Sequence, residues 1–377
     1  MITASFAAMM MAEQGARVIK VEPLEMGDPM RYIGTSKGGI SALFANCNRG
    51  KESIRINLKD EGGQDLVQRL AEDADVLVHN FRPGVMDRLN LGSEVLRSLN
   101  PRLVYVAISG FGKDGPLGNA PAYDPIIQAH AGLTASQGTD APVFIRNLMC
   151  DKITAYTAIQ AITAALLVRE KTGDGQHIDL AMLDAGLFFI FPDGFMNHTL
   201  LDDDIEVQPR LADLIYELTS TSDGLITMSA ATDQQRAGVL LALDRQDMLE
   251  DDRFSSLEKL LVNMDAFREE LAESFLRFST DEILSRLRDQ HVPAAECYGY
   301  EDVLSQPQIV SNNTVEVQKH PIMGSMRIVK SPAKFSGKRL ESASLSPSHG
   351  QHTKSVLSGL GLSEDEIRKY EEQGIVR

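Results

Sequence analysis

Closely spaced cysteines are missing from this sequence. Its three cysteines, Cys47, Cys150 and Cys297, lie far apart and form no CxxC motif. The sequence therefore predicts neither a disulfide framework nor a zinc site, and we expect no metal. The first residues also lack the basic, apolar and small-residue order of a signal peptide. A reducing compartment, the cytoplasm, fits this pattern best.

Long apolar runs and an excess of basic residues are missing as well. The longest apolar candidate, residues 185–191, is followed by Pro192 and Asp193, and a membrane-spanning helix needs about 20 apolar residues. The net charge is −16. Because nucleic acids and anionic membranes are themselves negative, we expect no general binding to either, although a local basic pocket is compatible with this charge.

The composition that remains is that of an ordinary globular protein, with 43% apolar and 24% charged residues. A chain of 377 residues exceeds the usual size of one domain, so we expect two. The acidic segment 201–204 (LDDD) is the expected linker between them.

Strands and helices alternate in the first two hundred residues. The segments with strand patterns are 17–21, 53–58, 75–81, 103–109 and 176–182. This alternation favours a parallel sheet in an α/β fold, whose ligands bind beyond the carboxyl ends of the strands. The turns at 80–84 and 110–112 follow such ends. A sheet of this kind rarely starts on a helix, so we expect that a first strand is missing ahead of the helix at 5–14.

Asp151 stands at the start of a long apolar helix that runs through residues 155–171. A carboxylate in this place can be a plain helix cap, which gains about 0.3–1 kcal/mol from the helix dipole. The same backbone N–H groups would also keep a nucleophilic or basic carboxylate ionised. Its place in the chain leaves both interpretations open, and the cap is the commoner one.

Basic residues gather in the first ninety residues of this acidic chain. Arginine and lysine at strand ends suit phosphate groups, because a guanidinium binds two oxygens and an ammonium is a compact charge. Phe81 beside Arg82 can stack on a purine. The alternative is a solvated basic face. The residues concerned are Arg49, Lys51, Lys59, Arg82 and Arg88.

Two glycine motifs occur without their usual context. Residues 110–115 fit GxGxxG after a strand, but Pro116 follows where a helix would be needed, so dinucleotide binding is not predicted. Residues 34–38 fit GxSxG, but no apolar strand leads into them.

Several longer segments resemble the family III CoA-transferases, the group that includes formyl-CoA transferase, carnitine CoA-transferases and α-methylacyl-CoA racemases. The resemblance runs from Ser5 to the C-terminus, and its most specific part combines Asp151 with residues 171–176 (KTGDGQ). The other matching segments are 15–22 (GARVIKVE), 48–51 (NRGK), 57–59 (NLK), 75–88 (DVLVHNFRPGVMDR), 109–116 (SGFGKDGP) and 123–124 (YD).

The resemblance implies a Rossmann-like large domain over residues 1–200, a small α+β domain over 201–312, and a segment 313–377 that returns to the large domain. It also implies an interlocked homodimer, with no cofactor apart from the CoA thioester that serves as substrate. Asp151 falls on the family's catalytic aspartate. The positions that line CoA in the transferases correspond to Ile56, Leu58, Lys59, Asn80, Phe81, Arg82, Arg88, Tyr123 and Asp124.

Three differences from the family pattern stand out. Racemases of this group look to carry a histidine at the position of Tyr123. The tyrosine of this chain resembles the transferases instead, which counts against proton exchange at an α-carbon. A first strand and a Gly-Pro turn are missing ahead of Ser5. The glycine-rich loop that covers the active site of formyl-CoA transferase has no counterpart between residues 201 and 222.

The sequence therefore predicts a cytoplasmic enzyme that moves CoA from an acyl-CoA to a small carboxylic acid through an acyl–aspartyl anhydride on Asp151. Its expected partners are these substrates and a second copy of the chain. Two alternatives stay open. One is a 2-methylacyl-CoA racemase or epimerase that uses Asp151 with another base, such as His130. The other is a catalytically inactive CoA-binding homologue.

Overall fold

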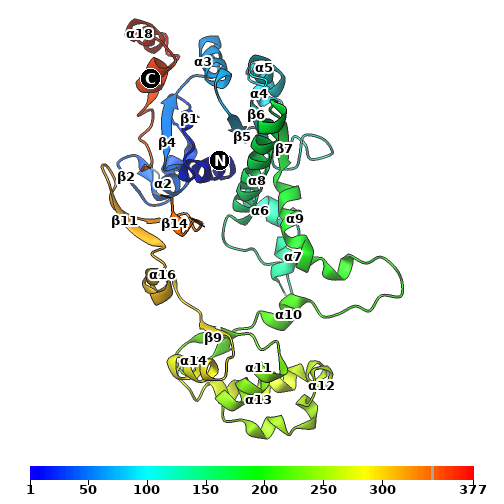
Figure 1. Ribbon diagram of the computed structural model, residues 1–377. Helices are drawn as coiled ribbons and strands as arrows, with labels where there is room; N and C mark the ends of the chain where they lie inside the picture. The colour runs from blue at the N-terminus through cyan, green and yellow to red at the C-terminus, as the bar shows by residue number, and fades with distance from the viewer. Residues whose placement is uncertain (139, 341–343) are drawn as a thin grey trace. The chain divides into compact units, whose positions relative to one another are not determined.

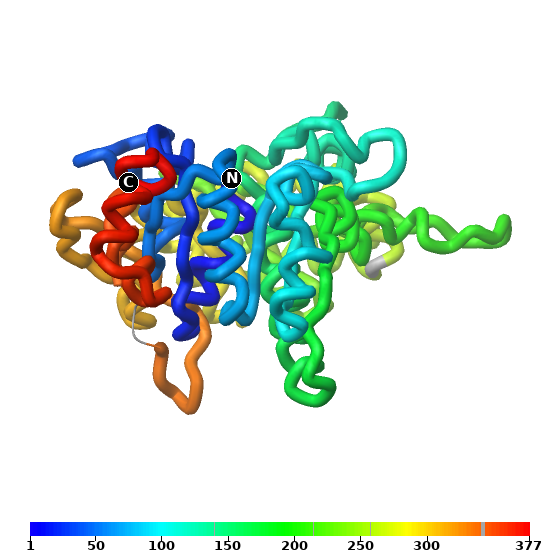
Figure 2. Tube along the Cα trace, turned by 90° about the horizontal axis from the view of Figure 1, so that it is seen from above, coloured from blue at the N-terminus to red at the C-terminus, as the bar shows by residue number. Residues whose placement is uncertain are grey.

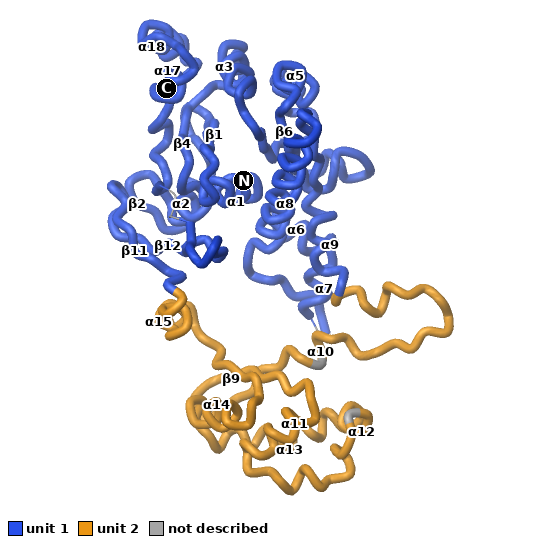
Figure 3. Tube along the Cα trace, in the orientation of Figure 1, with its two compact units in different colours: residues 1–192, 313–377 blue, residues 193–312 orange. Residues whose placement is uncertain are grey.

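The computed structural model describes residues 1–138, 140–340 and 344–377 (Figure 1). The chain forms two compact units, shown in different colours in Figure 3. Unit 1 consists of Met1–Pro192 and Asn313–Arg377, and unit 2 consists of Asp193–Asn312. The first boundary thus lies at Pro192, ahead of the acidic segment in which the sequence places a linker, and the C-terminal residues belong to unit 1.

Unit 1 is built on short parallel strands. They are β1 (Val18–Glu22), β4 (Lys51–Arg55), β5 (Val76–His79), β6 (Val104–Ser109) and β7 (His177–Ala181). β1 pairs with β4, and β6 lies between β5 and β7, with every pair parallel. Apolar residues run through such strands because helices cover both faces of a parallel sheet. The predicted α/β architecture is confirmed.

Helices connect and cover these strands. Those of unit 1 include α1 (Ile2–Glu13), α2 (Ala42–Asn48), α3 (Glu61–Glu72), α4 (Val85–Arg88), α5 (Ser93–Leu99), α6 (Asp124–His130), α7 (Leu133–Gln137), α8 (Met149–Thr172), α9 (Met182–Gly194), α17 (Thr353–Gly359) and α18 (Glu364–Glu372). α3 shows how the local sequence sets the start of a helix and its buried face. Asp60 caps it by accepting the Gly62 N–H at 2.9 Å, and one face buries Leu66 and Val67.

The main hydrophobic core of unit 1 joins segments from both ends of the chain. Ile54 of β4, Leu66 of α3 and Leu96 of α5 are fully buried. They belong to one cluster with Val356 and Leu357 of α17. Each such side chain contributes roughly 1.5–3 kcal/mol to stability. The red C-terminal helices accordingly lie beside the blue strands β1 and β4 in Figures 1 and 2.

α1 packs along α8, a helix of 24 residues. Both helices bury small side chains: Ala7 of α1 and Ala155 and Ala158 of α8 are fully buried. Small side chains at a helix contact allow a short interaxial distance. α1 begins at Ile2, ahead of the start predicted at residue 5. The additional turn brings Thr3 into contact with the N-terminal end of α8.

The remaining strands of unit 1 form antiparallel pairs. They are β2 (Ser36–Lys37), β3 (Ile40–Ser41), β11 (Val315–His320), β12 (Gly324–Val329), β13 (Lys334–Phe335) and β14 (Lys338–Arg339). The GxSxG match lies in the β2–β3 hairpin, so its serine does not occupy a strand-to-helix elbow.

Unit 2 is a smaller α+β unit with an antiparallel sheet in the order β10-β9-β8. Its strands are β8 (Thr219–Ser220), β9 (Leu225–Met228) and β10 (Ala294–Glu296). Its helices include α10 (Leu211–Ile215), α11 (Asp233–Ala242), α12 (Leu257–Val262), α13 (Met264–Phe275), α14 (Thr280–Asp289), α15 (Tyr300–Ser305) and α16 (Pro307–Ser311). Ile226, Phe275, Ile283 and Leu287 are buried in its core.

Three segments with a helical sequence pattern do not form one continuous helix. The segment 183–200 is helical only to Gly194, shortly after Pro192, which cannot donate a backbone hydrogen bond. The segment 257–278 divides into α12 and α13 at Asn263. The segment 301–310 divides at Gln306 (ψ 126°), because a residue before proline disfavours the helical conformation. No helix in the described part of the chain is long and apolar enough to span a membrane.

Candidate active site

Asp151 lies in the first turn of α8 without capping it. The N-cap residue, Leu148, offers no side-chain acceptor. The backbone N–H of Asp151 instead donates to Asp124 Oδ2, at the start of α6, at 2.9 Å. Asp124 is 2% exposed. The interpretation of Asp151 as the cap of α8 is therefore wrong: Asp124 accepts a backbone N–H at this helix end, and the Asp151 carboxylate is left for another role.

The Asp151 carboxylate contacts a second helix. The hydroxyl of Thr3, in the first turn of α1, donates a hydrogen bond to Asp151 Oδ1. The carboxylate thus lies at the N-terminal ends of both α1 and α8. Because unpaired N–H groups give a helix N-terminus a partial positive charge, both ends favour the ionised form of Asp151.

Burial acts in the opposite direction. Desolvation raises the pKa of Asp151 above its ordinary value, the hydrogen bonds from Thr3 oppose this rise, and the nearby charge of Asp124 adds to it. A raised pKa makes the ionised carboxylate a stronger nucleophile. Burial also raises the pKa of the neighbouring Cys150 thiol to about 12. Cys150 is thus a neutral thiol at physiological pH and does not compete as a nucleophile.

Gln128 fixes the chain that enters α8. Its amide nitrogen donates to Asp124 Oδ1 at 2.6 Å, and to the backbone oxygens of Ile145 and Asn147 at 3.1 and 3.0 Å. Its amide oxygen accepts the N–H of Ile145 at 3.2 Å. One buried side chain therefore ties the start of α6 to the segment before Asp151 and sets where α8 begins.

Phe81 and its neighbours follow the carboxyl end of β5. Asn80 and Arg82 are exposed, and Phe81 is 45% exposed. His79 Nδ1 accepts the Phe81 N–H at 3.2 Å, and the two rings lie 6.0 Å apart. Burial, together with His177, lowers the pKa of His79 to about 4. The ring is therefore neutral at physiological pH and keeps the lone pair with which it holds this turn.

The other positions expected to line CoA fall into two groups. Lys59 and Arg88 are exposed, and Tyr123 is 69% exposed at the start of α6. Leu58 is half-buried. The side chain of Ile56, by contrast, is 1% exposed in the core, and its N–H donates to the Glu22 oxygen at 3.0 Å. The side chains of Ile56 and Asp124 thus face the protein, Leu58 packs against the edge of the core, and Lys59, Arg88 and Tyr123 face solvent.

Arg49 and Lys51 do not belong to an exposed basic group. Arg49 pairs with Glu13 at 2.6 Å, and Lys51 is 4% exposed with its ammonium bonded to protein oxygens. The hypothesis that they bind phosphate is wrong, because exposure depends on packing that a local sequence pattern does not reveal.

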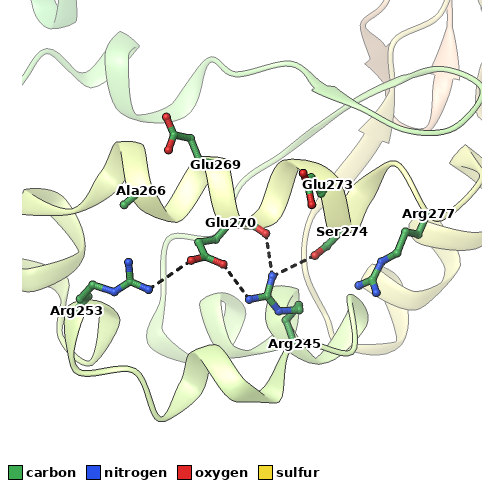
Figure 4. A pocket seen from close by; sticks show the side chains of 8 residues that line it. All are labelled: Arg245, Arg253, Ala266, Glu269, Glu270, Glu273, Ser274 and Arg277. Carbon is green, nitrogen blue, oxygen red and sulfur yellow. Dashed lines mark hydrogen bonds and ion pairs between the residues drawn. The ribbon is translucent and has the colours of Figure 1, made fainter.

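Unit 2 contains an open polar hollow of about 730 Å³ (Figure 4). Arg245 pairs there with Glu270 at 3.1 Å, and Arg253 pairs with Asp251 at 2.7 Å. These acids neutralise the arginines, so the hollow offers little free positive charge, and it contains no residue predicted from the sequence. Across the described residues, no group of three histidine, cysteine or acidic side chains is arranged to hold a metal.

Comparison with known proteins identifies the family. The sequence pattern described as CoA-transferase family III matches residues 1–353. An acetyl-CoA:oxalate CoA-transferase of Acetobacter aceti is 31% identical over 88% of this chain and 85% of its own length. The succinyl-CoA:glutarate CoA-transferase of Homo sapiens is 28% identical over 98% of this chain and 84% of its own length.

Comparison of the fold with solved structures identifies the same family. The crystal structure of a CAIB/BAIF family protein from Brucella suis has a TM-score of 0.83 with this structure, at 29% identity, over 95% of this chain and 96% of that one. The resemblance seen in the sequence is confirmed over nearly the whole chain. The protein belongs to CoA-transferase family III and is an enzyme that transfers CoA.

Proposed function

We propose that Asp151 is the nucleophile of this CoA transfer and that the reaction passes through an anhydride between Asp151 and the acyl group. The observation that supports it is that Asp124, and not Asp151, caps the start of α8. Asp124 accepts the helix N–H, and the carboxylate of Asp151 lies between two helix N-termini with a raised pKa.

The proposed cycle begins when an oxygen of Asp151 attacks the carbonyl carbon of the acyl-CoA thioester. A C–O bond forms, the C–S bond breaks, and the CoA thiolate leaves with the bonding electron pair. The product is a mixed anhydride of Asp151 and the donor acid. Covalent catalysis of this kind divides one difficult exchange into easier steps.

The thiolate then attacks the aspartyl carbonyl carbon, the donor acid leaves as a carboxylate, and CoA stays on Asp151 as a thioester. The acceptor carboxylate attacks this thioester and forms a second mixed anhydride. The released thiolate attacks the acceptor's carbonyl carbon, which yields the new acyl-CoA and restores the Asp151 carboxylate. One acyl bond replaces another in each step, so the free energy of the thioester is conserved without ATP.

Each step places negative charge on a former carbonyl oxygen. The first turns of α1 and α8 contain backbone N–H groups that have no acceptor within their helices. Groups of this kind, held in place before the reaction, stabilise a tetrahedral intermediate without reorganising. We assign this role to the two helix ends beside Asp151.

CoA is proposed to bind along the carboxyl ends of β4 and β5. Lys59, Arg82 and Arg88 supply exposed positive charge for its phosphates, and the exposed ring of Phe81 supplies an apolar surface for adenine. Ile56 and Asp124 are proposed to contribute through their backbone, because their side chains are buried. The remaining proposed contacts are Leu58, Asn80 and Tyr123.

The acceptor is proposed to be a small dicarboxylic acid, and succinyl-CoA is the first donor to test. Support comes from the two relatives named above, whose names specify oxalate and glutarate as acids.

The position of His130 favours transfer over racemisation. This residue lies at the far end of α6 from Asp124, about 9 Å along the axis, and its ring packs against Phe111 at 5.2 Å.

A homodimer is also proposed. Phe188 and Phe189 on α9 are 81% and 56% exposed, an unusual exposure for neighbouring phenylalanines. A second copy of the chain would bury them, and each buried phenylalanine contributes roughly 1.5–3 kcal/mol. Sedimentation of the wild-type protein and of Phe188→Ser tests the proposal, which fails if both are monomers.

The function is tested by incubating the enzyme with succinyl-CoA and a panel of dicarboxylic acids, with mass spectrometry of the CoA esters. We expect a new acyl-CoA with wild-type enzyme, none with Asp151→Asn, and full activity with Asp65→Asn, an exposed acid on α3. Transfer by Asp151→Asn at the wild-type rate contradicts the mechanism. Deuterium uptake at the α-carbon without transfer would indicate a racemase, and thermal stabilisation by CoA without any turnover would indicate an inactive homologue.

A further inference from the structure

Thr3 contacts Asp151 from outside the helix that contains Asp151. Its hydroxyl donates to Asp151 Oδ1, and Thr3 is 1% exposed. The catalytic proposal above needs only backbone N–H groups from this turn of α1. The hydroxyl is thus an additional donor, which bonds one oxygen of the carboxylate from a buried position.

Two lysines fasten the turn that contains Thr3. Lys51 Nζ donates to the backbone oxygen of Ser5 at 2.7 Å, and Lys20 Nζ donates to the Ser5 hydroxyl at 3.2 Å. The other donors of Lys51 bind the Cys47 oxygen at 3.0 Å and Asn48 Oδ1 at 2.8 Å. An ammonium has three N–H donors, so all three of Lys51 are used to join α1 to α2 and β4.

Lys51 is buried, so its hydrogen bonds from β4 to α1 and α2 are needed for stability. Burial lowers the pKa of Lys51 well below its ordinary value. Within the described chain, no carboxylate forms an ion pair with it. A buried cation without a partner destabilises a fold unless its hydrogen bonds are fully satisfied, as they are here.

We propose that Thr3 is a positioning residue for Asp151: its hydroxyl holds one carboxylate oxygen so that the other faces the thioester carbon, and Lys51 holds the turn of α1 from which Thr3 acts. The inference rests on the proposed role of Asp151. A carboxylate fixed before the substrate arrives loses less freedom on the way to the transition state.

The first test compares Thr3→Val, which removes the hydroxyl and keeps the branched shape, with Thr3→Ser, which keeps the hydroxyl. We expect Thr3→Val to lower kcat by about ten-fold or more, as for a hydrogen bond to a charged group, with KM for the acyl-CoA unchanged. Thr3→Ser should retain most of the wild-type kcat. Equal losses in both variants, or an unchanged kcat in Thr3→Val, would overturn the proposal.

The pH profile provides a readout that a merely structural role would not move. Removing a donor to the ionised carboxylate disfavours that form, so the acid limb of kcat/KM should move to higher pH in Thr3→Val and stay in place in Thr3→Ser. The other titratable groups that face Asp151 are Asp124 of α6, Cys150 of α8 and the α-amino group of Met1, and both variants leave them in place. An acid limb that does not move in Thr3→Val contradicts the proposal.

Lys51→Met tests the attachment. If Lys51 acts through Thr3, its removal should lower kcat by a smaller factor in the Thr3→Val background than in the wild type, because the hydrogen bond is already absent. Lys20→Met, which frees the Ser5 hydroxyl, allows the same comparison if Lys51→Met does not fold. Equal factors in both backgrounds would show that the lysine does not act through Thr3.

Failure of this inference differs from failure of the proposed function. An inactive Asp151→Asn beside a fully active Thr3→Val rejects the role of Thr3 and leaves that of Asp151. A wild-type protein that transfers no CoA, or an Asp151→Asn variant that still does, rejects the function itself.

Discussion

Asp124 caps the helix that presents Asp151. Its Oδ2 accepts the backbone N–H of Asp151 at 2.9 Å, and its Oδ1 accepts from Gln128 at 2.6 Å. A residue next to the exposed Tyr123 thereby fixes the start of α8. The two carboxylates differ in role because Asp124 bonds two other parts of the protein, whereas the Asp151 carboxylate receives its hydrogen bonds from one residue, Thr3.

Replacing Asp124 by alanine is expected to lower stability and kcat together. It leaves the Asp151 N–H without its acceptor and removes one of the three acceptors of the Gln128 amide, and a buried unsatisfied group costs about 1–3 kcal/mol. Urea unfolding and steady-state kinetics measure both effects. Asp65→Ala, in an exposed part of α3, is the matched control and should change neither. Wild-type stability in Asp124→Ala contradicts the assigned capping role.

Replacing Arg82 or Lys59 by methionine is expected to raise KM for the acyl-CoA while kcat stays nearly constant. A phosphate contact stabilises the bound substrate and the transition state equally, and the loss of one charge-assisted contact corresponds to roughly ten-fold in KM. Arg368→Met, which removes an exposed arginine on α18 paired with Asp365, is the control. A fall in kcat without a change in KM would assign these residues another role.

The pH dependence of stability should contain a contribution from His79. Burial lowers its pKa from the ordinary 6.5 to about 4, so between these values the unfolded chain binds a proton that the folded protein does not. Stability therefore falls as the pH falls through this window, by at most about 1.4 kcal/mol per pH unit.

The variant His79→Gln removes this titration and keeps an acceptor for the Phe81 N–H. Urea unfolding at several pH values between 6.5 and 4 should give a shallower decline for the variant than for the wild type. Identical slopes would mean that His79 is not buried in its neutral form.

The order of strands and helices in unit 1 follows from local signals in the sequence. The apolar run that forms β6 and the amphipathic pattern of α3 depend on neighbours along the chain, so their positions were predictable. The division of the segment 301–310 was also readable from Pro307. The division at Asn263 has no comparable local signal.

Contacts between distant segments explain what the sequence did not reveal. Thr3 and Asp151 are 148 residues apart in the chain, and no spacing rule relates them. Asp151 itself was identified through resemblance to the family. Arg49 and Lys51 have the same charge as Arg82, and only the packing of α1 and α2 separates buried cations from exposed ones.

Isotope transfer from the acceptor acid tests the proposed anhydride on Asp151 most directly. In the proposed cycle the acceptor carboxylate attacks the aspartyl thioester, and one of its oxygens remains on Asp151 when the second anhydride is resolved. Turnover with an acceptor labelled with ¹⁸O in its carboxylate should therefore place ¹⁸O in the tryptic peptide 147–152, which contains Asp151 as its only acid. Formation of the new acyl-CoA with no ¹⁸O in that peptide would contradict the mechanism.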